Sequence, residues 1–220
     1  MSFLVSDGGY RSSLLAGCAG IEHHFGVAGH APAGAWLELR QIHSARVIDA
    51  SEWRPGVEGD ALATGAAGIR LAVKTADCIP LLLADERGRA VAAVHAGWRG
   101  VVQGIGAAAV RFLSERYLIQ PGELVAALGP AIGGCCYEVG PEVAVQFRDW
   151  FPERNDLERR TRIDLREALR RQLLAAGVKA GRMDVAEECT CCGGNRFHSY
   201  RRDGAQAGRM YSVISLREGG

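Results

Sequence analysis

The sequence predicts a mixed α/β fold, in which mixed β-sheets pack together and are flanked by helices, in a single domain over residues 1–220. Three observations support this prediction. Short apolar runs of strand length alternate with segments of helical spacing, as expected for a mixed fold. The chain contains no internal repeat, low-complexity tract or linker that would divide it. Its 220 residues are enough to bury a sizeable core.

The composition is that of an ordinary globular protein. Hydrophobic residues make up 48% of the chain and charged residues 23%, and the formal net charge is +1. Without a charge excess, we expect no nucleic-acid partner and no membrane partner. The N-terminus lacks a basic start followed by an apolar run, so we expect no secretory signal and a cytoplasmic location. Seven cysteines, an odd number, favour thiols or metal ligands over a disulfide framework.

The first part of the chain predicts short elements. Residues 1–35 are rich in Gly, Ala and Ser and predict loops and short edge elements. Strands are expected at 36–39 and 46–50, on either side of His43. Asp60 lies between a glycine and an apolar stretch, and the default interpretation of such an isolated acid is a turn cap.

The middle of the chain predicts three strands with polar residues at one of their ends. Two apolar runs predict strands at 69–74 and 79–84. The junction between them contains Thr75, Asp77 and Cys78. A third run, AVAAVHAGWRG, predicts a strand that ends in His95 and turns at once into a helix. A lone histidine there would usually be a core residue, but several strand ends with reactive side chains favour a site.

The remaining elements follow from helix and strand signals. A small-residue helix is expected after Arg99, and a strand at 124–128. Pro141 predicts the first turn of a helix that continues to about Phe151. Asp164 with a glutamate three residues later resembles a capping box before another helix. The tail combines cysteines, a histidine and paired arginines with a closing strand.

His43, Cys78 and His95 form a candidate metal-ligand set. Zinc binds imidazole nitrogen and thiolate sulfur, and catalytic zinc sites use three protein ligands with one open position. The spacings of 35 and 17 residues match no short zinc motif. A cysteine with histidine partners also fits a Cys-His hydrolase, so the residues alone leave both chemistries open.

Carboxylates and arginines close to these residues suggest further roles. Asp77 and Asp60 offer carboxylates for proton transfer or for orienting a ligand. Arg99, with Arg201 and Arg202 in the tail, can hold phosphate or another anion through forked hydrogen bonds.

The other cysteines predict buried thiols. The pattern C-x-C-C in the tail is interpreted as lacking the paired C-x-x-C spacing of a zinc knuckle. A second metal centre is therefore not the preferred interpretation for Cys135, Cys136, Cys189, Cys191 and Cys192.

Six motifs, taken in order, resemble one protein family. They are QIHSARV, GDALAT, VKTADCIPLLLAD, AVHAGWRG, LGPAIGGCCYEVG and FHSYRRDGAQAGRMYSVI, and they cover residues 41–216. They resemble the laccase-domain family, also called multicopper polyphenol oxidase or peptidoglycan editing factor, whose members are described as purine nucleoside phosphorylases. The resemblance implies one domain of this type over residues 1–220.

The resemblance implies an activity and a site. The activity is phosphorolysis of adenosine, inosine, guanosine and S-methyl-5'-thioadenosine, together with adenosine deamination. The partners would be these purine nucleosides and phosphate, and the protein would be a monomer or homodimer. The implied catalytic residues are His43, Cys78, His95 and Asp77, of which the first three bind zinc. Substrate or phosphate would contact Asp60, Arg99, Cys136 and Arg201.

Copper, polyphenol oxidation and cell-wall chemistry are the alternatives. Copper oxidation is the older label of the family, but one His/Cys/His set without H-x-H pairs is sparse for a multicopper centre. A Cys-His hydrolase in cell-wall precursor quality control is a second alternative, and a non-enzymatic peptidoglycan factor is a third.

The chain departs from the family pattern near its start. The family carries H-G-F-S-T-R, whereas HHFGVA places Ala28 where the arginine would stand. The segment before the Q-x-H motif is also shortened. If the family's arginine contacts substrate, we expect this chain to bind a different ligand or to work more slowly.

Overall fold

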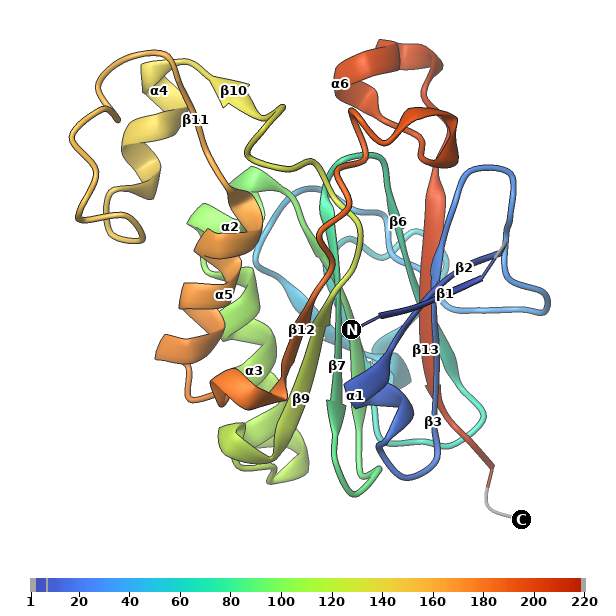
Figure 1. The fold of residues 1–220 in the computed structure, drawn as a ribbon. Helices are drawn as coiled ribbons and strands as arrows, with labels where there is room; N and C mark the ends of the chain where they lie inside the picture. Colours follow the sequence, from blue (N-terminus) through green and yellow to red (C-terminus); the bar gives the residue numbers. More distant parts are fainter. Residues whose placement is uncertain (1–2, 7, 219–220) are drawn as a thin grey trace.

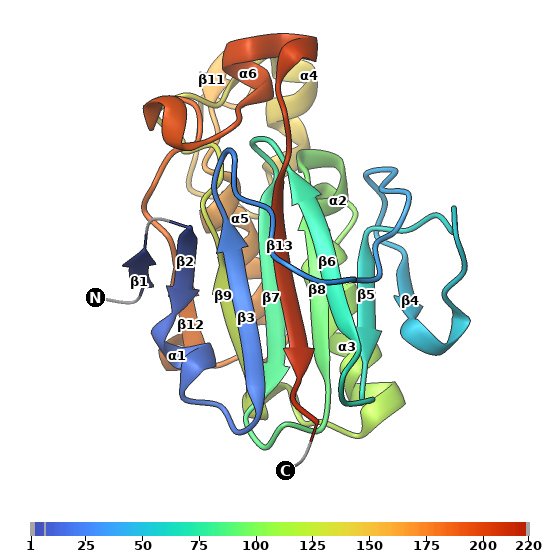
Figure 2. The same ribbon diagram turned by 90° about the vertical axis from the view of Figure 1, so that its right-hand side faces the viewer.

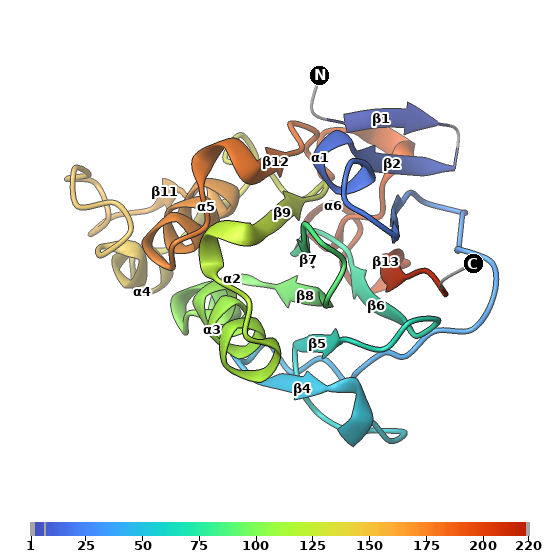
Figure 3. The same ribbon diagram turned by 90° about the horizontal axis from the view of Figure 1, so that it is seen from below.

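Two β-sheets lie face to face in the computed structural model, which describes residues 3–6 and 8–218 (Figure 1). Helices cover the outer face of one sheet, and the segment that follows β3 (Ile21–Gly26) crosses the outer face of the other (Figure 2). Seen from below, the helices, the first sheet and the second sheet form three successive layers (Figure 3). This arrangement confirms the predicted fold class.

The central layer is a six-stranded mixed sheet with the order β12-β9-β7-β8-β5-β4. Two of its pairs, β4 with β5 and β9 with β12, are parallel, and the others are antiparallel. Its strands are β4 (Val47–Asp49), β5 (Ala61–Thr64), β7 (Ile79–Asp85), β8 (Val91–Ala96), β9 (Leu124–Leu128) and β12 (Met183–Val185).

Both faces of this sheet are buried, which explains the uninterrupted apolar runs in the sequence. Leu81 and Leu83 of β7 pack into the core beneath the helices. The intervening Leu82 packs into the second core, between the two sheets. The covering helices are α2 (Trp98–Val102), α3 (Ile105–Tyr117) and α5 (Leu165–Ala175).

The second sheet is antiparallel and has the order β1-β2-β3-β13-β6, seen face on in Figure 2. Its strands are β1 (Phe3–Ser6), β2 (Gly9–Ser12), β3 (Ile21–Gly26), β6 (Arg70–Thr75) and β13 (Met210–Leu216). The closing strand of the tail is therefore central, because β13 pairs with both β3 and β6.

Short elements complete the chain. The helices are α1 (Ser13–Ala16), α4 (Pro141–Ala144) and α6 (Tyr200–Asp203), and the strands are β10 (Glu138–Val139) and β11 (Thr161–Arg162). The 3-10 turns are η1 (Ala50–Glu52), η2 (Pro121–Glu123), η3 (Val145–Phe147), η4 (Ala180–Arg182), η5 (Gly194–Arg196) and η6 (Gly204–Gln206). None of the helices in the described part of the chain is both long and apolar enough to span a bilayer.

Four local predictions need correction. The expectation of only loops and edge elements before residue 36 is wrong, because β3 lies inside its sheet with alternate side chains buried. The strand expected at 36–39 is wrong as well, since only an isolated bridge from Leu37 to Leu71 forms. The helix expected to reach Phe151 ends at Ala144 and continues as a 3-10 turn.

The single helix expected after Arg99 is also wrong. The segment forms two helices, α2 and α3, because the chain takes a left-handed conformation at Gly104, with φ of 88°. The remaining predicted strands at 69–74, 79–84, 90–95 and 124–128 are confirmed within one residue at each end. Asp164 also caps α5 as expected, accepting hydrogen bonds from the N–H groups of Arg166 and Glu167.

Candidate active site

The topology brings the three predicted metal donors together at one sheet edge. Strand β7 begins where β8 ends, with Ile79 opposite Ala96, so Cys78 and His95 are neighbours. His43 arrives from the loop before β4, and its Nε2 lies 3.9 Å from the Sγ of Cys78. One donor atom from each of the three residues lies within 4.8 Å of the others.

Asp60 holds two of these donors in place from beneath. Its buried carboxylate accepts hydrogen bonds from the backbone N–H groups of His43, at 3.0 Å, and Ser44, at 2.6 Å. Its Oδ1 also lies 2.8 Å from Nδ1 of His95. A proton on Nδ1 makes this hydrogen bond and leaves Nε2 of His95 free as a ligand. Asp60 therefore caps a turn, as expected, and also orients the histidine.

The same contacts shift the acid–base properties of the site. Burial raises the pKa of Asp60, but hydrogen bonds from His95 and Ser44 outweigh it and lower the pKa to about 2. Burial also opposes ionisation of Cys78, yet hydrogen bonds and charge from His43 and His95 lower its pKa to about 6. Burial lowers the pKa of His95, but hydrogen bonds and charge from Asp60 and Cys78 outweigh it and raise the pKa to about 9. A carboxylate and a thiolate thus flank one imidazole, a charge distribution that suits a bound cation.

These residues fit a transition metal ion. Imidazole nitrogen and thiolate sulfur are ligands that both zinc and copper accept. Asp60 already holds the ring of His95 in one orientation, as the outer-shell partner of a metal-binding histidine would. His43, Cys78 and His95 all line one cavity, so a fourth position on a metal held by them would face that cavity.

The cavity has a volume of about 550 Å³ and mixed polar and aromatic walls. This volume lies within the range of roughly 300–1,000 Å³ that is typical of small-molecule sites. The cationic side chains on its walls are Lys74, Arg99, Arg201 and Arg209, and the aromatic ones are Trp98, Tyr137 and Tyr200. The buried hydroxyl of Thr75, also on the wall, has no hydrogen-bond partner among the described residues. The cavity is therefore built for a ligand that is both anionic and apolar in parts.

The two predicted anion-binding arginines differ in how they are held. The Arg99 guanidinium stacks over the Trp98 ring, 4.5 Å from its centroid. In the described ranges, no acceptor is hydrogen-bonded to that guanidinium. The Arg201 guanidinium lies over the Tyr137 ring, and its Nη1 donates to the carbonyl of Glu138 at 2.8 Å. Arg99 therefore has the more available hydrogen-bond donors.

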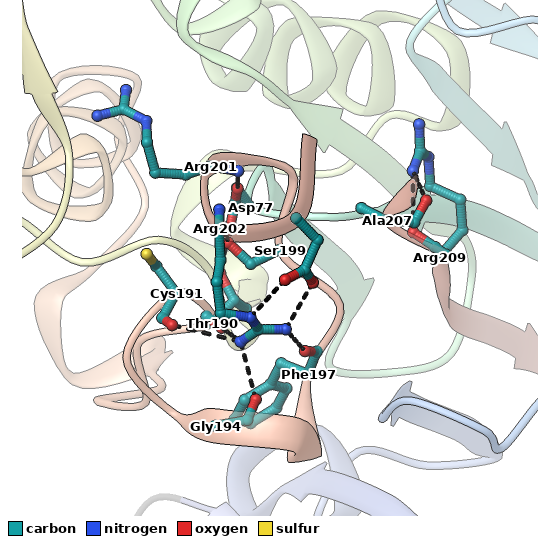
Figure 4. A network of polar contacts seen from close by, with 12 residues as sticks. Asp77, Thr190, Cys191, Gly194, Phe197, Ser199, Arg201, Arg202, Ala207 and Arg209 are labelled. Atoms are coloured by element: carbon teal, nitrogen blue, oxygen red, sulfur yellow. Dashed lines mark hydrogen bonds and ion pairs between the residues drawn. The ribbon is translucent and has the colours of Figure 1, made fainter. Parts of the chain in front are cut away.

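Asp77 links the metal-donor edge to α6, as Figure 4 shows. Its Oδ1 accepts a hydrogen bond of 2.6 Å from the Thr190 hydroxyl, and its Oδ2 accepts one of 2.7 Å from the backbone N–H of Arg201. Both carboxylate oxygens are thus engaged, although the residue borders the cavity. The geometry makes Asp77 an orienting group rather than a free acid.

Arg202, expected beside Arg201 as an anion-binding group, has a different environment. Its guanidinium pairs with Asp203 and donates to the carbonyl groups of surrounding loop residues (Figure 4). Because these bonds occupy its donors, Arg202 ties the tail loop together and does not line the cavity.

Six of the eight predicted site residues line the cavity, and two do not. The residues that line the cavity are His43, Asp77, Cys78, His95, Arg99 and Arg201. Asp60 does not line the cavity but is hydrogen-bonded to His95, which does, and the sulfur of Cys136 lies beside those of other cysteines. Ala28, at the position of the family's arginine, follows β3 and does not line the cavity.

Sequence reasoning missed several wall residues. They are Gln41, Lys74, Tyr137, Tyr200 and Arg209. All five lie within the six family motifs. Lys74, Tyr137 and Tyr200 are each next to a residue with a predicted role or ligand type, and this proximity could have selected them. These neighbours are Thr75, Cys136 and Arg201. Arg209 had no such signal, because the path of the tail over the site is a tertiary feature.

The prediction of buried thiols is wrong for part of the tail and its neighbours. Cys135 and Cys192 are exposed and Cys136 is half-buried, whereas Cys189 is buried. The tail does contain C-x-x-C spacing, contrary to the prediction, because Cys189 and Cys192 have it around Thr190 and Cys191.

Comparisons with known proteins identify a family and several relatives. A family model described as multi-copper polyphenol oxidoreductase laccase matches residues 22–217. A Deinococcus radiodurans protein named purine nucleoside phosphorylase is 44% identical over 195 residues, which cover 85% of this chain and 73% of that protein. A protein named adenosine deaminase RL5, from an unknown prokaryotic organism, is 39% identical over 191 residues, covering 80% and 72%.

A solved structure also matches the whole fold. The crystal structure of YlmD from Geobacillus stearothermophilus superposes with a TM-score of 0.86 at 29% sequence identity. The match covers 99% of each chain.

Proposed function

The chain belongs to the multi-copper polyphenol oxidoreductase laccase family, and we propose that it is a zinc-dependent purine nucleoside phosphorylase with adenosine deaminase activity. The proposed substrates are adenosine, inosine, guanosine and S-methyl-5'-thioadenosine. The observation that carries the proposal is the convergence of His43, Cys78 and His95 on a cavity with arginine and aromatic walls. The names of the relatives support the choice of reaction.

In this proposal, His43, Cys78 and His95 hold the metal ion. A bound zinc ion supplies a Lewis acid at the base of the cavity. Asp60 orients His95 and the loop of His43, and Asp77 orients α6 and Arg201. The two carboxylates act through these neighbours, because each already accepts several hydrogen bonds from the chain.

The arginines of the cavity bind the phosphate, and its aromatic side chains contact the purine. Arg99 and Arg201 bind phosphate through charge-assisted hydrogen bonds. Tyr137, Tyr200 and Trp98 offer surfaces for the purine. A phosphate oxygen attacks the anomeric carbon of the ribose, and the glycosidic C–N bond breaks. The electron pair of that bond leaves with the purine, which takes up a proton to balance the one that the attacking phosphate gives up.

Deamination of adenosine is the second proposed activity. It is favoured by the relative named adenosine deaminase. Here water replaces the amino group on the purine ring and ammonia leaves, so the same cavity would receive the purine nearer the metal donors. The two reactions give different products from one substrate, which makes them separable.

Product analysis tests the proposal. Zinc-loaded protein is incubated with each of the four nucleosides, with and without phosphate, and the products are separated by chromatography. We expect free purine base and sugar phosphate only when phosphate is present, and inosine from adenosine in either case. Absence of base, sugar phosphate and inosine would contradict the proposal.

Variants and metal analysis separate the alternatives. Cys78→Ser should abolish the activity, whereas Cys18→Ser, outside the cavity, should leave it unchanged. Stoichiometric copper with oxygen uptake on phenols would instead favour the oxidase. Cys78-dependent hydrolysis of a cell-wall precursor without metal would favour the hydrolase, and full biological activity of a Cys78→Ala variant would favour the non-enzymatic factor.

A further inference from the structure

Four cysteines form a second cluster outside the cavity. Cys135 and Cys136 lie on the turn that follows β9, and Cys189 and Cys192 lie on the loop that follows β12. The four sulfur atoms all lie within 4.8 Å of one another. The Sγ of Cys135 is 3.7 Å from the Sγ of Cys136 and 3.7 Å from that of Cys192.

We propose that Cys135, Cys136, Cys189 and Cys192 bind one structural zinc ion, separate from the site of His43, Cys78 and His95. Structural zinc sites are closed and tetrahedral, and four thiolates are a common ligand set. With Zn–S distances near 2.3 Å, neighbouring sulfurs in a tetrahedron lie about 3.8 Å apart. Two sulfur–sulfur distances already match that value, and small rotations of the cysteine side chains bring the others to it.

The backbone holds the two loops together independently of the cysteines. Strands β9 and β12 are parallel neighbours, so the loops that follow them leave the sheet side by side. Ala131 and Cys189 form an isolated bridge, and the Thr190 N–H donates to the Ala131 carbonyl at 3.1 Å. The four sulfurs are therefore brought together by a preorganised scaffold.

The turn at Gly133 is shaped for the sulfurs. Its N–H donates to the Sγ of Cys189 at 3.2 Å, as expected for a thiolate that is oriented from outside the coordination sphere. A Cβ at Gly133 would come within 2.9 Å of the Arg166 Nη2, 3.2 Å of the Cys135 Sγ and 3.3 Å of the Cys189 Cβ. Glycine thus lets the two segments approach closely enough to share an ion.

Two arginines lie where they would offset the charge of the site. A zinc ion with four thiolates has a net charge of −2. Arg166 donates to the carbonyl groups of Ala186 and Glu188, which precede Cys189. Arg201 donates to the carbonyl of Cys136 at 3.3 Å. These two cations next to the loops balance the two negative charges.

The second ion would stabilise one wall of the cavity. Cys136 precedes Tyr137, which lines the cavity, and Cys189 precedes Thr190, which holds Asp77. The zinc would therefore fix the positions of Tyr137 and Asp77 without touching a substrate. This role does not depend on which reaction the cavity performs.

Metal analysis of the full chain tests the proposal. The purified protein is loaded with zinc, freed of excess metal, and its zinc content is measured by mass spectrometry. We expect two zinc ions per chain in the wild type and one in a Cys135→Ser, Cys192→Ser double variant. Both substituted residues are exposed, so serine should not disturb the fold. Cys191→Ser is the matched control within the same loop and should retain two ions.

Cobalt substitution gives a spectroscopic readout that can already be measured on the wild type. In the wild type, a tetrathiolate cobalt site should give thiolate-to-metal charge-transfer bands stronger than those of a site with one cysteine. Cys78→Ser should keep the stronger bands, and the double variant should lose them.

Several results would overturn the second zinc site. They are one zinc per chain in the wild type that the double variant retains, two in the double variant, or a disulfide between Cys135 and Cys192 in protein purified under reducing conditions. An inactive protein with two zinc ions would contradict the proposed enzyme function and leave the second site intact. An active protein with one zinc ion at Cys78 would do the reverse.

Discussion

His43 and Asp77 both have left-handed backbone conformations, with φ of 59° and 89°. Apart from Leu118, they are the only non-glycine residues in the described ranges with positive φ. Such conformations cost free energy and persist where surrounding contacts fix them. Asp60 fixes the first, and Thr190 with Arg201 fixes the second. The free-energy cost of these two conformations is thus offset by the hydrogen bonds that orient His43 and Asp77.

Replacing Asp60 tests its orienting role. Asp60→Asn should reduce zinc affinity roughly 10- to 100-fold, because the ring of His95 loses its charged partner. The affinity is measured by competition with a chromogenic chelator. Ser44→Ala removes only one donor to Asp60 and should have a smaller effect. Unchanged zinc affinity in a folded Asp60→Asn protein would show that His95 does not need this partner.

Replacing Arg99 tests phosphate binding. Arg99→Ala should raise KM for phosphate roughly 10- to 100-fold, the equivalent of one charge-assisted hydrogen bond. The KM for nucleoside should change less. Arg111→Ala, an exposed arginine on α3, is the control and should change neither constant. Equal effects of the two variants would assign the phosphate to other residues.

At this scale, the sequence predicted the donors better than their surroundings. Cys78 and His95 could be found because each lies at the end of an apolar run. The hydrogen bonds that occupy Asp77 could not be predicted, because their donors lie 113 and 124 residues away. The same holds for Arg202, whose partners are set by the tail loop.

Among the elements, the break between α2 and α3 is stabilised by one buried side chain on α5. Gln172 is fully buried, accepts a hydrogen bond from the Gly106 N–H at 2.7 Å and donates to the Val101 carbonyl at 2.9 Å. It thus satisfies backbone groups that the helix ends leave unpaired. These contacts join α5 to α2 and α3 and cannot be seen in the local sequence, which predicted one long helix in place of α2 and α3.

Replacing Gln172 tests this interpretation. Gln172→Leu should lower the free energy of unfolding by roughly 2–4 kcal/mol, since two buried backbone groups lose their partner. Chemical denaturation measures the change. Arg170→Ala, on the exposed side of the same helix, should cost less than about 0.5 kcal/mol. A loss of similar size in both variants would contradict the role of Gln172.

The turn between β7 and β8 depends on an ion pair. The Asp85 side chain is fully buried and bonds the Arg89 guanidinium at 2.8 Å, and Arg89 also pairs with Glu123. Burial raises the pKa of Asp85, but the hydrogen bonds and charge of Arg89 outweigh it and lower the pKa. A lowered pKa in the folded state stabilises the protein above the unfolded pKa, and this contribution is lost as pH falls through the folded value.

Arg89→Ala should therefore cost roughly 1–3 kcal/mol at neutral pH, and the difference from wild type should shrink as the medium becomes acidic. Denaturation at a series of pH values measures this. Arg87→Ala removes a longer, exposed pair with Glu123 and should cost less than about 0.5 kcal/mol. A pH-independent difference for Arg89→Ala would contradict the pairing with Asp85.

The central strands were predictable because both faces of the middle sheet are buried, which leaves long apolar runs in the sequence. Their pairing was not. The parallel pairing of β9 with β12 joins segments that are separated in the sequence by α4 and α5, and no local sequence pattern predicts it. The clustering of four cysteines follows from that contact, which is why the separate motifs did not reveal it.

For the whole molecule, the candidate site lies where the two sheets meet. Cys78 and His95 come from the six-stranded sheet, whereas Lys74 and Thr75 end a strand of the other sheet. The tail loop with α6 lies over this end of both sheets (Figure 2). The cavity is thus lined by residues that come from both sheets and from the tail. The location in the cytoplasm and the choice between monomer and homodimer stay predictions.

The ratio of phosphate consumed to hypoxanthine released from inosine tests the proposed function most directly. Phosphorolysis predicts that zinc-loaded protein consumes one phosphate for each hypoxanthine released, and that Cys78→Ser releases none. Release of hypoxanthine without loss of phosphate, or an unchanged rate in Cys78→Ser, would contradict a phosphorylase centred on His43, Cys78 and His95.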